Sequence, residues 1–404
     1  MLAQFLNPFY PAAEQREPLP PLYYLFAFAV QVLGYFLGPG AIQAFAVGSV
    51  HLALTLQRPR FTNGDVVSDF CLAGTTIVFL ISYLDLGTAT ENGPRYVGRP
   101  DKPLPDGGVG ERDPKTWAQR LKWSVRLATA SRGVGWNWRV KGVPEHPEAG
   151  LPRFRFVRRR VVEVAWRVAL KFLAVYGIGF CKTVQSSVAS PLANWFLDAA
   201  VSWCGAFWSW NTIGSAYAAG AAAAVLLGIC EPWEWPPVFG VLGDAWSVRQ
   251  VWSTSYHQIL RRPFQQPGIR LARLLGLEKG TVASRYLQLY LAFFLSFSTH
   301  WWQSYTVSRQ DNGELAFFMM QPVIITIEDF LQWVWGKFMG PKRKESLAWL
   351  EIYMGYAWTV AAFTLTFRPV MKGWTSIGLI GSGGPDETTA LKLGQRHGAA
   401  YFRG

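Results

Sequence analysis

The chain has 404 residues, half of them apolar, and a formal net charge of +13 at pH 7. A soluble chain of this length would form two or three domains, but here the apolar residues come in long blocks, which favours a membrane protein instead. The basic residues lie beside these blocks, as cytoplasmic loops of membrane proteins require, so we expect no nucleic-acid partner.

Several stretches are predicted to cross a bilayer, because a spanning helix needs about 20 mostly apolar residues. Two more short or tilted spans fit within the aromatic and alanine-rich region between Ala193 and Ile229. The predicted fold class is therefore an all-α, polytopic transmembrane helix bundle with about eight spans and an error of about two. In chain order, the clearest predicted spans are residues 21–36, 39–56, 66–86, 161–180, 286–302, 315–338 and 347–367.

A turn between the first two spans is predicted at Gly38, Pro39 and Gly40, because glycine and proline interrupt a helix. The two spans should therefore form a tight helical hairpin. After the third span, residues 87–160 hold 16 Lys and Arg against 7 Asp and Glu, so we expect this loop to be cytoplasmic. Within it, Thr116 to Thr129 has the pattern of an amphipathic helix lying at the membrane surface. Further basic clusters are Arg261, Arg262, Arg270 and Arg273, and then Lys342, Arg343 and Lys344.

The segment after the alanine-rich region is richer in proline and more polar. Residues 231–237 contain three prolines and cannot form a helix interior. Asp244 to Arg262 is amphipathic and too polar to face lipid, so we expect a re-entrant or interfacial segment.

His300 is the first candidate for chemistry, because ionisable groups inside predicted spans mark functional sites. At helical spacing, Ser296, His300, Gln303 and Ser304 form one polar stripe on an otherwise apolar helix. The alternative is a core histidine that bonds a neighbouring helix.

His257 is the second candidate. In the helix expected around it, one face carries Arg249, Trp252 or Ser253, Tyr256 and Leu260, and Arg261 and Arg262 end the segment. Arginines there suit the phosphates of an acyl donor such as coenzyme A, because a guanidinium gives planar bidentate contacts. A plain cytoplasmic anchor explains the same charges equally well.

A third polar stripe, Gln321, Glu328 and Gln332 with Asp329 beside it, runs along a predicted span. Buried carboxylates of this kind usually hold a partner helix or a cation in place. No aspartate-rich motif for a magnesium diphosphate is present, nor GxSxG or HExxH, and the four cysteines form no CxxC pair. We therefore predict no metal site.

Taken together, five segments resemble the wax synthase-like branch of the membrane-bound O-acyltransferase superfamily, especially its fungal members that acetylate terpenoid and meroterpenoid alcohols. In that family a histidine in a hydrophobic helix is the general base, and His300 matches its position. His257 matches a second polar residue upstream, although the usual Gly and Arg before it are replaced by Ser253 and Thr254. The segments are 62–65, 132–138, 235–240, 252–262 and 318–332.

The resemblance implies direct acyl transfer, with His300 taking the alcohol proton and His257 orienting a reactant or stabilising the oxyanion. The co-substrate would be acetyl-CoA or another acyl-CoA, with no permanently bound cofactor. The hydrophobic alcohol would arrive from the lipid bilayer. The residues expected to contact the acyl-CoA are Arg249, Trp252, Arg261 and Arg262, and the supporting polar residues are Ser296, Gln303, Glu328 and Asp329.

On this basis residues 1–404 are expected to form one integral membrane domain, with the basic loop at about 87–160 and the catalytic region at about 231–338. The expected location is the endoplasmic reticulum, with several passes. Three alternatives stay open. They are long-chain acyl transfer to a fatty alcohol or sterol, a membrane terpene cyclase that uses Glu231, Glu328 or Asp329 as acid, and a transporter or lipid-binding scaffold.

Overall fold

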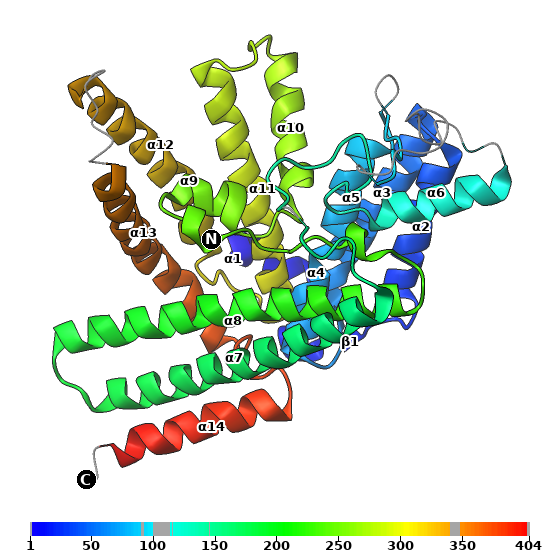
Figure 1. Ribbon diagram of the computed structural model, residues 1–404. Coiled ribbons are helices and arrows are strands. Elements are labelled where there is room, and N and C mark those ends of the chain that lie inside the picture. The colour runs from blue at the N-terminus through cyan, green and yellow to red at the C-terminus, as the bar shows by residue number, and fades with distance from the viewer. Residues whose placement is uncertain are drawn as a thin grey trace. The chain divides into compact units, whose positions relative to one another are not determined.

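The computed structural model describes residues 2–89, 93–99, 114, 116–144, 146–339 and 348–401, and helices make up most of this part of the chain (Figure 1). The predicted basic cluster at 342–344 lies outside these residues. The chain divides into two compact units. Unit 1 comprises Met1–Gly64, Ser68–Val143 and Gln258–Gln310, and unit 2 comprises Asp65–Val67, Pro144–His257 and Asp311–Gly404.

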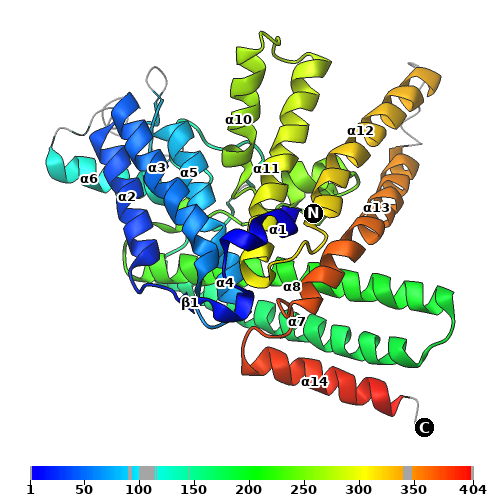
Figure 2. The ribbon, with the colours of Figure 1, turned by 180° about the vertical axis from the view of Figure 1, so that it is seen from behind.

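Unit 1 is built on the predicted hairpin. Helix α2 (Tyr23–Leu37) turns at Gly38, whose φ of 86° suits glycine, and α3 (Ala41–Gln57) packs back against it (Figure 2). The third predicted span is two helices, α4 (Val66–Ala73) and α5 (Thr75–Leu86), separated at Gly74. The amphipathic α6 (Trp117–Thr129) packs on α2, and a capping box between Thr116 and Gln119 starts it. Helices α10 (Arg261–Leu274) and α11 (Val282–Ser308) pair as a second hairpin.

At one end of unit 1, buried ion pairs centred on Asp69 join segments that are far apart in the sequence. Its carboxylate pairs with Arg58 at 2.9 Å and Arg16 at 2.7 Å, and it accepts hydrogen bonds from Thr62 and from the backbone of Asn63. Beside it, strand β1 (Glu17–Pro18) runs parallel to β2 (Phe61–Thr62). Unit 1 also contains the short helices α1 (Leu2–Leu6), η1 (Asn7–Phe9), η2 (Ala13–Gln15) and η3 (Arg58–Arg60).

Arg309 joins the end of α11 to this same region. It adopts a left-handed conformation with φ 58°, and its guanidinium donates to the carbonyls of Tyr305, Thr306, Pro11 and Pro59. The last carbonyls of a helix have no partner within it, so a cation here satisfies them and suits the helix dipole. Burial lowers the pKa of Arg309 to about 10, so it stays charged at neutral pH.

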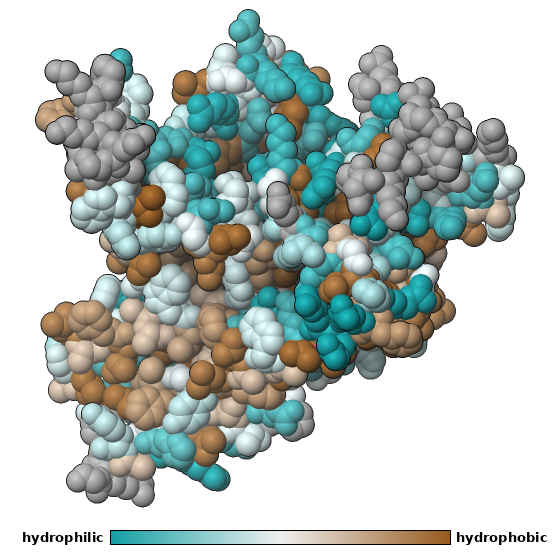
Figure 3. All heavy atoms as spheres, viewed as in Figure 1, coloured by the Kyte–Doolittle hydropathy of each residue, from teal (hydrophilic) through white to brown (hydrophobic). Residues whose placement is uncertain are grey.

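Unit 2 contains a layer of three long helices (Figure 1). Helix α7 (Arg153–Ser187) and α8 (Pro191–Leu226) form a hairpin, and α14 (Pro385–Ala400) packs on α7. Glycines allow close approach: a Cβ at Gly394 would lie 2.1 Å from the Tyr176 carbonyl oxygen, and one at Gly179 would lie 2.3 Å from that of Leu391. Apolar residues gather over the α7–α8 pair in the space-filling view (Figure 3).

The rest of unit 2 carries the second histidine. It contains η4 (Pro232–Glu234), η5 (Leu242–Asp244), α9 (Val248–Gln250), the π-helical turn η6 (Val251–Ser255), α12 (Glu314–Met339) and α13 (Ala348–Ser376). Helix α12 packs on both α9 and α13.

Two sequence predictions are wrong in detail. Residues 193–229 do not form two short spans, because α8 runs unbroken for 36 residues through Asn211 and its glycines. Asp244 to Arg262 is not one amphipathic segment either, since the π-helical turn ends at Ser255 and α10 starts at Arg261. Leu260 therefore does not share a helical face with Arg249.

Within the described residues, Val66–Leu86 alone is both long and apolar enough to cross a membrane by composition, and Tyr23–Leu37 is apolar but shorter. Other helices meet the length requirement. At about 1.5 Å per residue, α7 and α8 each exceed the roughly 30 Å of a hydrocarbon core. The basic and acidic residues near the start of α7, such as Arg160 and Glu163, lower its apolar content.

Candidate functional site

His300 lies two turns before the end of α11, half-buried among aromatic side chains. Its ring stacks on Phe70 of α4 with a centroid separation of 6.4 Å. The Gln303 side chain, one turn later on the same helix face, hydrogen-bonds the His300 side chain. A neutral imidazole held by a partner in an apolar surrounding is suited to accept a proton.

The polar stripe around His300 faces protein along its second half. Gln303 and Ser304 are buried, with Ser304 fully excluded from solvent, whereas Ser296 is half-buried. Such a stripe needs protein or a cavity on its polar side, as the sequence predicted.

Gly74 makes this packing possible, a role that the sequence analysis missed. A Cβ at Gly74 would lie 2.9 Å from Gln303 Nε2 and 3.1 Å from the Thr299 methyl. The break between α4 and α5 thus lies against the residue that bonds His300. An isolated glycine within a predicted span is the only signal that pointed to it.

His257 belongs to unit 2 and is the second residue after the end of the π-helical turn. Its ring centroid lies 4.5 Å from that of Tyr256, which is packed against Trp210 and Phe239. Gly240 donates to the Ser255 carbonyl at 3.0 Å, and a Cβ there would lie 2.2 Å from the Thr254 carbonyl oxygen. π-helical turns are rare and frequently occur at functional sites.

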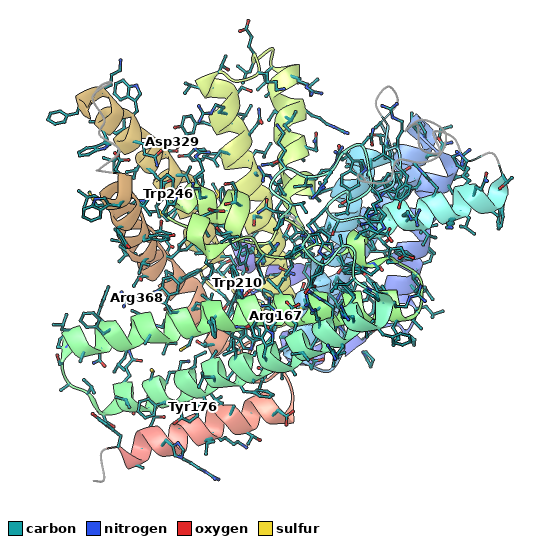
Figure 4. The ribbon with its side chains drawn as sticks, in the orientation of Figure 1. Arg167, Tyr176, Trp210, Trp246, Asp329 and Arg368 are labelled. Carbon is teal, nitrogen blue, oxygen red and sulfur yellow. The ribbon has the colours of Figure 1, made fainter. Side chains whose placement is uncertain are left out.

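Glu328 and Asp329 of α12 hold the start of this segment. The Glu328 carboxylate accepts the backbone N–H groups of Val248 at 2.8 Å and Arg249 at 3.3 Å, and the Trp358 indole N–H at 3.2 Å. Asp329 forms a two-contact ion pair with the Arg249 guanidinium, and α9 lies beside the labelled Asp329 (Figure 4). The Glu328 carboxylate satisfies free N–H groups at the start of α9, where negative charge is also favoured.

The Trp252 side chain is held by two successive hydrogen bonds inside unit 2. Its indole N–H donates to Gln321 Oε1 at 3.1 Å, and Gln321 Nε2 donates to Thr366 at 3.2 Å. The predicted stripe of Gln321 and Glu328 therefore faces the segment that leads to His257.

Arg261 and Arg262 lie in unit 1, at the start of α10. Arg262 forms an ion pair with Asp85 and lies over the Trp138 ring at 4.9 Å. Arg261 donates to the Lys141 carbonyl at 2.8 Å, and burial lowers the pKa of its guanidinium.

Asp85 was missed in the sequence, as was Asp69. Both are carboxylates inside the predicted span 66–86, and the rule that led to His300 applies to them too. Arg270 also reaches Asp85, at 3.1 Å. Within the described ranges no group of three His, Cys, Asp or Glu side chains is arranged to hold a metal ion.

The chain is similar to known proteins of one family. A model of the membrane bound O-acyl transferase family matches residues 235–320, which include both histidines. The acetyltransferase ple2 of Rhodocybe pseudopiperita is 29% identical over 86% of this chain and 89% of its own length. The acetyltransferase eriL of Hericium erinaceus is 30% identical over 64% of this chain and 68% of its own.

A third relative carries a different name. The O-Mevalon transferase macI of Penicillium terrestre is 31% identical over 63% of this chain and 62% of its own length. No solved structure matches the chain. The matched residues and the extent of these similarities establish that the chain is an acyltransferase and belongs to the membrane bound O-acyl transferase family.

Proposed function

We propose that the chain transfers an acetyl group from acetyl-CoA to the hydroxyl group of a terpenoid or meroterpenoid alcohol. The observation that carries the proposal is the similarity to an acetyltransferase over 86% of this chain. The half-buried His300 with its Gln303 partner supplies the kind of base that this reaction needs.

In the proposed reaction His300 takes the alcohol proton while the alcohol oxygen attacks the thioester carbonyl. The carbon–sulfur bond then breaks, and CoA leaves as the thiol after regaining a proton. Gln303 keeps the imidazole in one orientation, and His257 orients a reactant or stabilises the oxyanion. No covalent acyl-enzyme is needed, and exclusion of water protects the thioester from hydrolysis.

For the donor, we assign Arg249, Trp252, Arg261 and Arg262 to the acyl-CoA. A guanidinium held by a carboxylate keeps free N–H groups in a fixed plane, which suits phosphate oxygens. The ion pair of Arg249 with Asp329 and that of Arg262 with Asp85 support this role.

We further propose a multi-pass protein of the endoplasmic reticulum, with about eight spans forming a single integral membrane domain over residues 1–404. The membrane-bound family supports this, and so do large apolar side chains that are exposed along the α7–α8 pair. Examples are Leu173, Leu192, Phe196, Phe207 and Leu226.

The test compares microsomes that carry the wild type, His300→Ala or His397→Ala. The last variant is a matched control, because His397 lies on α14 and bonds Tyr176. Each sample receives acetyl-CoA with terpenoid, sterol or fatty alcohols, and both CoA release and ester mass are followed. We expect His300→Ala to lose about a hundredfold or more in rate, as expected for loss of a general base, and His397→Ala to keep its activity.

The same assay separates the alternatives. Full activity of a membrane-inserted His300→Ala variant would refute the assigned base. Faster ester formation from palmitoyl-CoA than from acetyl-CoA would replace acetylation by long-chain transfer. A wild type that releases no CoA with any donor, but cyclises an alcohol-free terpenoid, would refute acyl transfer.

A further inference from the structure

A cavity of about 140 Å³ lies wholly within unit 1, among α2, α5, α6 and residues 259–263. It involves neither His300 nor His257. Most of its wall is apolar and comes from Val78, Phe79, Leu86, Leu127, Trp138 and Leu260. An apolar cavity of about 150 Å³ holds a benzene molecule, so one six-membered ring fits this space.

Gln31 and Tyr35 of α2 give the cavity a polar side. Gln31 is 1% exposed, and its Nε2 donates to the Tyr35 hydroxyl oxygen at 2.7 Å. Among the described residues, no hydrogen bond reaches Gln31 Oε1. In this bond the Tyr35 hydroxyl group acts only as the acceptor. Its own hydrogen is not used in the bond to Gln31 and can be donated to a ligand.

This pair is therefore complementary to a hydroxyl group, which donates one hydrogen and accepts others. A buried acceptor without a hydrogen bond is costly, so a ligand that supplies the missing donor binds with a gain. The carbonyl of Gln31 would accept the ligand hydrogen, and the phenol of Tyr35 would donate to the ligand oxygen.

Charge within the cavity selects a neutral ligand. Its two charged lining residues, Asp85 and Arg262, already pair with each other. An anionic ligand inside the cavity would lie beside the Asp85 carboxylate, so two negative charges would meet in a partly buried space.

We propose that this cavity is a binding site for the hydroxyl-bearing ring of a neutral lipophilic alcohol. The ring lies against Val78, Phe79 and Leu127, and the hydroxyl group lies at Gln31 and Tyr35. The site does not depend on the roles assigned to His300 and His257, because ring binding needs no acyl donor and no histidine, although its wall shares Arg262 with the proposed donor contacts.

The experiment uses the purified full-length protein in detergent and two probes of equal size, cyclohexanol and methylcyclohexane. Thermal unfolding is followed at increasing probe concentration, because a ligand that binds the folded state raises the midpoint. We expect both probes to raise the midpoint for the wild type. Gln31→Leu should weaken cyclohexanol binding about fivefold to tenfold, as expected for one lost hydrogen bond, and should leave methylcyclohexane unchanged.

Two further variants complete the design. Val78→Phe fills the cavity and should abolish the response to both probes. Gln43→Leu is the matched control, because Gln43 lies on α3 and does not line the cavity, and it should respond like the wild type. If Gln31→Leu does not fold, Tyr35→Phe gives the same comparison.

The proposal is overturned if neither probe shifts the wild type, which would mean that the cavity holds water only. It is also overturned if Val78→Phe responds like the wild type, or if the loss of the Gln31 amide affects both probes equally.

Discussion

Gln303 occupies the space that a methyl group at Gly74 would need, and this one contact links the break in the third predicted span to the His300 side chain. Gly74 has an ordinary right-handed helical backbone, with φ −80°. Alanine there is thus compatible with the backbone, but the Gln303 amide would have to shift to make room for the methyl group.

We predict that Gly74→Ala lowers kcat by about tenfold to a hundredfold, because a small displacement of a catalytic group is costly. The measurement is acetyl transfer by the membrane-inserted variant. Gly48→Ala is the control: its Cβ would meet Leu80 at 3.8 Å, an ordinary contact, and the rate should not change. Equal rates for both variants would mean that Gln303 does not hold the base.

Glu328 positions the segment that leads to His257, much as Gly74 leaves room for the side chain that bonds His300. Glutamine at this position keeps one acceptor, but its amide group would face the N–H groups that the carboxylate now accepts. We predict that Glu328→Gln lowers kcat by about tenfold with little change in the KM of the alcohol.

The control for this prediction is Glu351→Gln. Glu351 likewise accepts an indole N–H, from Trp335 at 2.9 Å, but it is not part of the cap on α9. A parallel loss in both variants would show a general effect of removing a carboxylate from unit 2.

At the scale of the elements, α14 approaches α7 closely at its glycines. Gly394→Ala would place a Cβ 2.1 Å from the Tyr176 carbonyl oxygen, whereas Gly336→Ala meets nothing within 4 Å. We predict that Gly394→Ala destabilises the protein by about 1–3 kcal/mol, as overpacking does. Gly336→Ala should be neutral or stabilising by about 0.5–1 kcal/mol. Thermal unfolding in detergent compares the two variants.

Most helices were predictable from the sequence because apolar blocks and turn residues mark them. The α2–α3 turn at Gly38 and the start of α6 at Thr116 follow from local chemistry. The unbroken course of α8 was not predictable, because Asn211 and the glycines weaken a helix and only packing against α7 offsets this. Helix α14 was not predicted. Its glycines weaken a helix by themselves, and their role in close packing is visible only once α7 lies beside them.

Some residues of the candidate site were predictable from the sequence, and others were not. His300 and Gln303 were found from helical period, and Glu328 and Asp329 from their place in an apolar helix. The π-helical turn before His257 has no sequence signature, because backbone caps from α12 and the contact of Gly240 fix it. The pairing of Arg262 with Asp85 joins residues 177 positions apart, which spacing along the chain does not reveal.

For the molecule in the membrane, the orientation follows from the basic cluster of α10. Arg262 and Arg270 of α10 pair with Asp85 at the end of α5, and the α10–α11 connection, which contains Lys279, lies at the end of unit 1 opposite to the β1–β2 pair (Figure 1). Basic residues favour the cytoplasmic side. We therefore predict that Gln15 and Lys279 face opposite sides of the membrane.

The test introduces Gln15→Cys or Lys279→Cys into a chain whose four cysteines are replaced by serine. An impermeant maleimide should label Lys279→Cys when only the plasma membrane is opened. It should label Gln15→Cys only when internal membranes are opened too. Labelling of both sites under the first condition would contradict the predicted orientation.

The guanidinium of Arg309 has a consequence for synthesis. It bonds the carbonyl of Pro11, which leaves the ribosome 298 residues earlier. At about 5–20 residues per second, the first helices wait roughly 15–60 s for this partner. During that interval the N-terminal segment is held only by earlier partners, such as Asp69 for Arg16, and the Pro11 carbonyl waits for its bond until translation passes Arg309.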